Sequence, residues 1–240
     1  RDDLELVGAF AHSADKVGRD VADLVGLDRP TGVMATDDVA ALLDLGPDCV
    51  VYTPLHFDVD EVTRILTAGV DVVTSAEFMS GRSLVGADRD RVEAAALAGG
   101  ASIFGSGMNP GFAQLLAAVS AGLAADVRHV RVTESVDVLA FAGDGNMDAL
   151  GWGRPAGDPG HAADVAAATA VFADAVDVLA TLLGHADADV ACTVEFAHAT
   201  RDLDPPGRSM PTGTVAGIDL RWDGLVDGRP VVEVHQRWVM

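Results

Sequence analysis

Basic side chains are scarce in this chain, and lysine is almost absent. Lys16 is the only lysine among the 240 residues, and 37 acidic side chains stand against 16 basic ones, which gives a formal net charge of −21. A chain this acidic repels the phosphate backbone of a nucleic acid. We therefore expect no nucleic-acid partner.

Cysteine is also rare, with Cys49 and Cys192 as the two examples in the sequence. Both lie in apolar, strand-like runs, where a buried reduced thiol is the ordinary interpretation, so neither a disulfide framework nor a zinc site is expected. No uninterrupted apolar run approaches the roughly 20 residues that cross a bilayer, and the first residues do not resemble a signal peptide. The sequence predicts a cytoplasmic protein with no membrane segment and no bound metal.

The sequence further lacks the glycine turn with which a dinucleotide-binding sheet usually opens. Such a sheet begins with a strand and a G-x-G-x-x-G turn that binds the pyrophosphate, and no such turn precedes the first apolar run, at Leu4. The nearest match, in the segment 105–111, spaces its glycines as G-x-G-x-x-x-G. Since the chain has no initiator methionine and stops at Met240 inside an apparent strand, we expect a first strand and turn upstream of Arg1 and a further C-terminal segment.

What the chain does contain is a regular alternation of strands and helices over its first half. Apolar runs predict strands at 4–10, 31–35, 49–52, 70–75 and 101–104, and the stretches between them predict helices over about 14–25, 37–45, 59–68 and 89–98. Strands that alternate with single helices form a doubly wound parallel sheet. Residues 1–125 are therefore predicted to be a Rossmann-type α/β domain that lacks its first strand.

The pattern changes in the second half. Residues 128–136 alternate like a half-buried strand, 142–160 form a glycine-rich loop, 161–183 form one long alanine-rich helix, and 190–197, 214–222 and 231–239 read as antiparallel strands. Six of the histidines show no metal-ligand spacing and are expected mostly at the surface: His56, His129, His161, His185, His198 and His235. Residues 126–240 are predicted to be an α+β domain.

A strand-loop-helix junction at 102–116 connects the two halves. Its strand runs into Gly105 and Gly107, and Asn109 is predicted to cap a helix over 110–124 with Pro110 in the first turn. Small molecules bind at the carboxyl edge of a parallel sheet, where free N–H groups at a helix start favour polar or anionic atoms. We expect this junction to border a ligand.

Four polar side chains follow the first apolar run, where the second strand of a Rossmann sheet would contact the adenosine ribose. They are His12, Ser13, Lys16 and Arg19. An acid at this point suits the free 2′-hydroxyl of NAD, whereas this set suits the 2′-phosphate of NADP. The alternative is a solvated helix start with scattered charges. Because the one lysine of an acidic chain lies here, NADP is the predicted cofactor, with NAD as the alternative.

Longer motifs resemble the dihydrodipicolinate-reductase-like dehydrogenases. They are LVGAFAHSADKVGRD at 6–20, VVYTP at 50–54, GSGMNPGF at 105–112 and WDG-x-x-DGRP at 222–230. Within this superfamily the chain is most similar to 2,4-diaminopentanoate dehydrogenase and the native amine dehydrogenases. The resemblance implies a Rossmann domain, an α+β domain for substrate binding and homo-oligomerisation, and reversible NAD(P)-dependent oxidative deamination of a small amine.

Two departures from related families narrow the chemistry. Dihydrodipicolinate reductases carry a histidine pair, a lysine and Pro-Ser-Gly-Thr where Glu134 is followed here by Ser-Val-Asp, and sugar-type oxidoreductases carry Glu-Lys-Pro where this chain has Ala76-Glu77-Phe78. In the similar amine dehydrogenases a glutamate near this point transfers protons. Amine oxidation needs a base that deprotonates the ammonium and activates water, so Glu77 is the candidate catalytic residue. Its alternative is an acid in the first turn of a helix.

The remaining candidates each have a plain structural alternative. Thr53, Pro54 and Leu55 end a central strand and are candidates for cofactor contact, or they only terminate the strand. Ser75 and Asn109 are candidates for hydrogen bonds to the nicotinamide amide, although helix capping alone explains Asn109. Trp152 either lines the substrate pocket or packs its loop onto the protein.

The sequence leaves three functions open. The first is the oxidoreductase acting on a C–N bond of a small amine, or on the corresponding carbonyl with ammonia. The second is an imine or carbonyl reductase of the same superfamily, and the third is a nucleotide-binding or structural protein without turnover.

Overall fold

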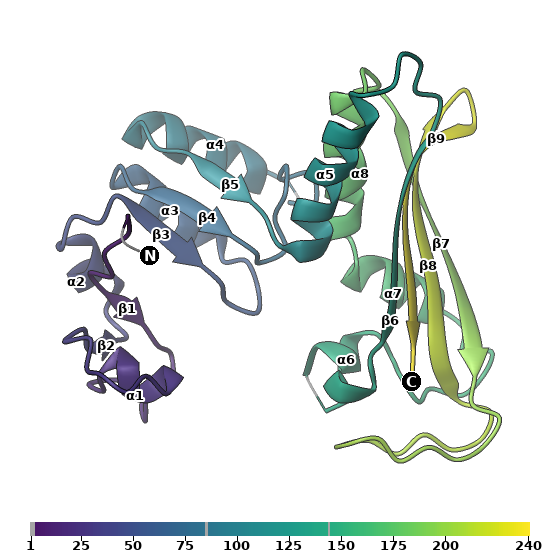
Figure 1. Cartoon of the computed structure of the whole chain (residues 1–240), viewed down its shortest axis with the longest axis horizontal. Helices are drawn as coiled ribbons and strands as arrows, with labels where there is room; N and C mark the ends of the chain where they lie inside the picture. Colours follow the sequence, from purple (N-terminus) through teal and green to yellow (C-terminus); the bar gives the residue numbers. More distant parts are fainter. Residues whose placement is uncertain (1–2, 85, 144) are drawn as a thin grey trace. The chain divides into compact units, whose positions relative to one another are not determined.

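The computed structural model describes residues 3–84, 86–143 and 145–240, which belong to two compact units (Figure 1). The first unit holds the residues up to 74 together with 90–104, and the second holds 75–89 and 105–240. The sequence placed a boundary at 125. The structure instead groups residues 75–89 and 105–125 with the second half, since the helix at 113–121 packs on elements of that half.

Parallel strands form the first unit, which confirms the predicted α/β class. β1 (Ala9–Phe10) pairs with β2 (Ala35–Thr36), and β3 (Cys49–Tyr52), β4 (Asp71–Thr74) and β5 (Ile103–Gly105) form a sheet in that order. The helices of this alternation are α1 (Val21–Val25), α2 (Val39–Leu43), α3 (Val59–Thr67) and α4 (Asp88–Gly99). α3 buries Val62, Ile65 and Leu66, and thereby supplies much of the apolar core of this unit.

The first predicted strand and helix are shorter than expected. Residues 4–8 stay outside the strand, and α1 begins only after Asp20, whose side chain accepts hydrogen bonds from the backbone N–H groups of Ala22, Thr31 and Gly32 and from the Thr31 hydroxyl. These bonds, the Thr31 hydroxyl first, lower the pKa of Asp20 to about 2. Asp20 therefore fixes where the helix starts, and Lys16 and Arg19 lie in a turn before it.

The second unit is built on a mixed four-stranded sheet. Its strands are β6 (Val130–Asp137), β7 (Asp189–His198), β8 (Val215–Val226) and β9 (Arg229–Val239), in the order β6-β9-β8-β7. β6 and β9 are parallel and the other pairs antiparallel. α5 (Ala113–Ala121), α7 (His161–Ala168) and α8 (Val171–Leu182) pack against these strands, and α5 and α8 lie on the same side of the sheet (Figure 1). The predicted α+β arrangement of elements is therefore present.

The long helix predicted at 161–183 is wrong, because two helices occupy that range. α7 ends where the Thr169 hydroxyl donates to the Val165 carbonyl at 2.7 Å, and α8 begins two residues later at an angle of 59°. Among the described residues no single helix is long and apolar enough to cross a membrane; α7 and α8 reach that length only when counted together. The glycine-rich segment before them contains η2 (Leu139–Phe141) at its edge and α6 (Gly145–Ala149).

The burial of two side chains, His161 and Cys49, differs from the sequence prediction. His161 is buried and not at the surface, since its ring stacks on Phe196 at 4.2 Å and its Nε2 lies 2.8 Å from the Leu150 carbonyl. Cys49 is exposed, and Cys192 is half-buried with its pKa raised to about 11 by burial. Both thiols are free.

Candidate functional site

The carboxyl ends of β1 and β3 border one pocket in the first unit. It has a volume of about 250 Å³, and three of the predicted cofactor residues line it: His12, Thr53 and Pro54. Apolar side chains such as Leu42 and Val50 supply most of the remaining wall. The lining also includes Pro47, which precedes β3, and Val50 and Val51 within it, so the pocket extends along β3 to its carboxyl end.

A tyrosine and a glutamate supply the polar part of this pocket. Tyr52 donates from its hydroxyl to Glu61 Oε2 at 2.7 Å and accepts from the Asp58 backbone N–H at 3.3 Å. Burial, followed by the bond to Glu61, raises the pKa of Tyr52. The phenol therefore stays protonated at neutral pH and holds Glu61 against the pocket wall.

The other predicted cofactor residues of this unit lie outside the pocket lining. Ser13 accepts the Lys16 backbone N–H at 2.9 Å through its carbonyl, which closes the turn after β1. The side chains of Lys16 and Arg19 are exposed on this turn, and Leu55 is exposed after β3. Exposed cations next to a strand end are accessible to a phosphate, but the structure does not bring them into contact with His12 or Thr53.

Asn109 does not cap a helix, in contrast to the sequence prediction. The segment η1 (Met108–Phe112) has extended backbone at Asn109 and Pro110, which are joined by a cis peptide bond, and α5 begins only at Ala113. The helix predicted from residue 110 therefore starts three residues later. The local sequence suited a cap, but hydrogen bonds to distant residues hold Asn109 instead.

Those hydrogen bonds form a polar chain in the second unit. Asn109 Nδ2 donates to Glu134 Oε2 at 2.9 Å, and Gln114 Nε2 donates to Asn109 Oδ1 at 3.0 Å. Gln114, which is buried, accepts the Gly111 N–H at 2.7 Å, and Trp238 Nε1 donates to Glu134 Oε1 at 2.7 Å. Both Glu134 oxygens and both polar atoms of the Asn109 side chain are thus engaged, so their positions are fixed.

Gln236 lies beside this chain, since it pairs with Glu134 in the register of β6 and β9. It is fully buried, and neither of its amide atoms has a partner among the described residues. Neither Gln236 nor Glu134 was predicted from the sequence as a member of a site. The sequence does contain a signal for Glu134, because the inward row of β6 consists of Val130, Val132, Glu134 and Val136, in which one acid interrupts apolar residues.

Ser75 and Glu77 come after β4 in the sequence. Both residues belong to the second unit, and both are exposed. Glu77 has φ of +44°, a left-handed conformation that non-glycine residues adopt rarely and that recurs at functional sites. The alternative interpretation of Glu77 as a first-turn helix acid is wrong, since the next described helix, α4, begins at Asp88.

Trp152 is packed into the apolar core of the second unit. Its side chain is buried, and the Arg208 guanidinium donates to its carbonyl at 3.2 Å. Its indole N–H has no partner among the residues that the structure describes. This position matches the alternative in which Trp152 holds its loop against the protein.

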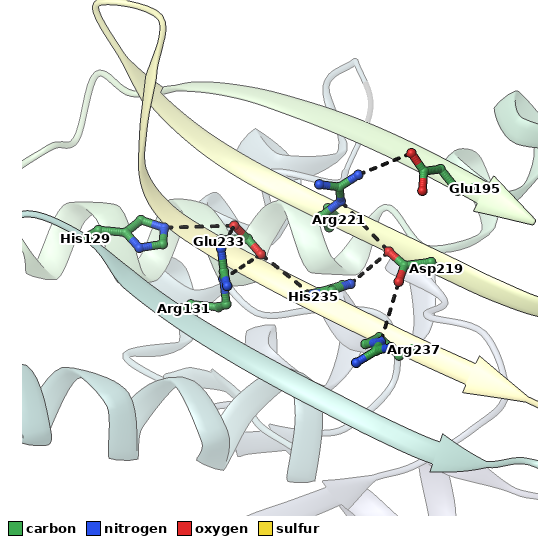
Figure 2. A network of polar contacts seen from close by, with 8 residues as sticks. All are labelled: His129, Arg131, Glu195, Asp219, Arg221, Glu233, His235 and Arg237. Carbon is green, nitrogen blue, oxygen red and sulfur yellow. Dashed lines mark hydrogen bonds and ion pairs between the residues drawn. The ribbon is translucent and has the colours of Figure 1, made fainter.

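A second polar cluster covers the face of the sheet opposite α8 (Figure 2). Glu233 lies 2.7 Å from Arg131 and 3.7 Å from His235, which in turn lies 2.8 Å from Asp219. Asp219 further approaches Arg221 and Arg237, and Arg221 reaches Glu195. Charges of opposite sign alternate across all four strands. Among the described residues no group of three or more His, Cys, Asp or Glu side chains could hold a metal ion.

Comparison with known proteins identifies the family. No family model matches the chain. An amine dehydrogenase of Streptomyces virginiae is 30% identical over 247 aligned residues, which cover 97% of this chain and 67% of that protein. The chain belongs to the amine dehydrogenase family. It is therefore a nicotinamide-dependent dehydrogenase. The family resemblance of the sequence motifs is confirmed.

Solved structures share the fold. An amine dehydrogenase from Mycobacterium smegmatis matches with a TM-score of 0.80 at 24% identity and covers 98% of this chain and 72% of that one. The WlbA dehydrogenase of Bordetella pertussis, solved with NADH and UDP-GlcNAcA, matches with a TM-score of 0.51 at 19% identity, over 100% of this chain and 60% of that one. These likenesses support the Rossmann-type α/β fold of this amine dehydrogenase family member.

Proposed function

We propose that the protein catalyses the reversible oxidative deamination of a small amine. The substrate ammonium, oxidised cofactor and water give a carbonyl compound, ammonium, reduced cofactor and a proton, so that two electrons leave the C–N carbon as a hydride. The observation that carries this proposal is the 30% identity to a protein named amine dehydrogenase over nearly the whole chain. The pocket at the ends of β1 and β3 supports it, since it offers a place for a nucleotide.

The residues around this pocket fit a nicotinamide cofactor. His12, Thr53 and Pro54 would hold it at the strand ends, and the exposed Lys16 and Arg19 would pair with a 2′-phosphate. The bound cofactor supplies the hydride acceptor, which the protein's own side chains cannot provide. Ser75 and Asn109 remain proposed partners of the nicotinamide amide, although the Asn109 side chain already bonds Glu134 and Gln114.

Glu77 is the proposed proton-transfer residue. Its carboxylate would take a proton from the substrate ammonium, so that the nitrogen lone pair can assist the departure of the hydride. After releasing that proton to solvent, it would deprotonate the water that attacks the iminium carbon. The left-handed backbone at Glu77 supports a functional role, because such conformations persist where the surrounding structure imposes them. Trp152 remains a proposed residue of the substrate pocket, although its side chain is buried in the apolar core of the second unit.

The test of this proposal is a titration of the full-length protein with NADPH and with NADH, followed by a screen of small amines for reduced-cofactor formation. Binding of either cofactor with amine-dependent turnover supports it. Turnover with imines or ketones alone would favour the reductase alternative, and absence of cofactor binding would favour a protein without turnover. Sedimentation of the same sample tests the homo-oligomer that the resemblance implies.

The cofactor preference gives a separate prediction. Replacing Lys16 and Arg19 together by alanine is expected to raise the Kd for NADPH about 100-fold or more, because charge-assisted bonds to a 2′-phosphate contribute roughly 1.5–3 kcal/mol each. The Kd for NADH should stay within about twofold. Fluorescence titration measures both constants. Arg29→Ala, which removes another exposed cation of the same unit, is the matched control, and an equal loss for both cofactors would contradict the assignment.

A further inference from the structure

Asp174 is a buried acid on α8, whose other buried residues are apolar. Its Oδ2 accepts the backbone N–H groups of Gly81 at 3.1 Å, Ser80 at 3.2 Å and Met79 at 3.4 Å. Its Oδ1 has no hydrogen-bond partner among the described residues. Burial raises the pKa of Asp174, whereas the backbone bonds lower it. A carboxylate in this position is costly to bury, so its backbone contacts call for an explanation.

The segment that Asp174 holds is the one that carries Glu77. Ser83 connects the two residues directly, since its hydroxyl lies 3.3 Å from Asp174 Oδ2 and 3.4 Å from the Glu77 carbonyl oxygen. Glu77 itself has the left-handed backbone described above, two residues before the first N–H group that bonds Asp174. The contacts of Asp174 therefore act on the backbone that sets the direction of the Glu77 side chain.

A second acid of α8 contacts the same segment in a different way. Asp177 pairs with the Arg82 guanidinium at 2.5 Å and lies 3.4 Å from the Ser80 hydroxyl. These are side-chain contacts at the partly exposed outer edge of the segment, with 40% of the Arg82 side chain exposed. Asp177 therefore offers a matched comparison, because it joins the same helix to the same segment but leaves the backbone N–H groups alone.

We propose that Asp174 is a positioning residue for Glu77, holding residues 79–83 in the turn that presents the Glu77 carboxylate to the substrate. This inference rests on the proposed role of Glu77 in proton transfer. Asp174 touches neither substrate nor cofactor in this scheme. It acts through the backbone, and its effect depends on hydrogen-bond acceptance and not on charge.

The test compares two variants that both remove the charge. Asp174→Asn keeps an oxygen that accepts the three N–H groups and places its amide NH2 where Oδ1 has no partner, so kcat should stay within about threefold of the parent. Asp174→Ala leaves the N–H groups without an acceptor, and kcat should fall about 100-fold with unchanged amine KM and cofactor Kd, as expected when a catalytic group is misplaced by about 1 Å. Asp177→Asn should change kcat less than threefold.

Two controls separate positioning from a general loss of stability. Val176→Ala shortens a fully buried side chain of the same helix, which belongs to the apolar core of the second unit, so it should lower the melting temperature and leave kcat unchanged. In a Glu77→Gln background, Asp174→Ala should cause no further loss of kcat. The proposal is overturned if Asp174→Ala keeps normal kcat, if Asp174→Asn loses as much as Asp174→Ala, or if Val176→Ala lowers kcat equally.

Hydrogen exchange distinguishes a failure of the positioning role of Asp174 from a failure of the proposed role of Glu77 in proton transfer. Asp174→Ala should increase amide exchange at Ser80 and Gly81 at least tenfold, whether or not Glu77 is catalytic. If Glu77→Gln retains turnover, the proposed role of Glu77 fails and the positioning inference falls with it, even where faster exchange shows that Asp174 holds the turn. If Glu77→Gln abolishes turnover and exchange in Asp174→Ala is unchanged, the positioning inference alone is overturned.

Discussion

Glu77→Gln is expected to lower amine-dependent turnover about 10³-fold while the Kd values for NADPH and NADH stay within about twofold. Glutamine keeps the size of the side chain and one acceptor oxygen but cannot accept a proton at neutral pH. Deprotonation of the substrate ammonium and activation of water would then lose their base. Steady-state kinetics and cofactor titration on the same preparation measure the two quantities separately.

Glu93→Gln is the control for this substitution, because Glu93 is an exposed acid on α4 and has no proposed role. Turnover of this variant should match that of the parent. Unchanged turnover in Glu77→Gln would remove Glu77 from the mechanism, and attention would then move to Glu134, whose carboxylate is fixed by Asn109 and Trp238.

Gly105→Ala is expected to cost the second unit about 1–3 kcal/mol of stability and to reduce turnover about 100-fold. A β-carbon at Gly105 would lie 2.1 Å from the Phe78 carbonyl oxygen and 2.6 Å from Met79 Cα, closer than real contacts allow. Both neighbours are backbone atoms of the segment that follows Glu77, so the side chain cannot be accommodated by a change of rotamer. Thermal melting and kcat measurements report the two effects.

Gly122→Ala is the matched control, since Gly122 at the end of α5 has helical backbone and a new β-carbon there would lie 3.4 Å from its nearest neighbour, the Val119 carbonyl oxygen. We expect this variant to be neutral or slightly more stable, because alanine restricts the unfolded chain. Equal melting temperatures and equal turnover for Gly105→Ala and the parent would show that the backbone contact with Phe78 tolerates a methyl group.

Local patterns predicted the parts of this fold that depend on local chemistry. The apolar run at 49–52 became β3 with the same bounds, and the alternation in the last third of the chain became β7, β8 and β9. These elements were predictable because strand periodicity reflects burial of one or both faces, which the sequence records directly. The resemblance of whole motifs then added the family, which periodicity cannot supply.

The candidate site was predictable only where a residue ends a strand. His12, Thr53 and Pro54 do line one pocket, whereas Asn109 was assigned as a cap because its nearest neighbours in sequence favour one. The bond from Asn109 to Glu134 joins positions 25 residues apart, and the bonds of Asp174 join it to residues more than 90 positions away. Hydrogen bonds between such distant positions produce no periodic pattern in the sequence. An acid within an apolar row, as at Glu134 and Asp174, nevertheless indicates a buried polar contact at that position.

The ionic cluster on the sheet has an evolutionary consequence (Figure 2). Glu233 is almost completely buried among Arg131, His129 and His235. These partners offset the free-energy cost of removing its carboxylate from water, so replacing one of them leaves part of that cost unbalanced. Substitutions at these positions should therefore be inherited together. Among homologues we expect correlated changes across β6, β8 and β9, so that a lineage exchanges the whole set of pairs and rarely one member of it.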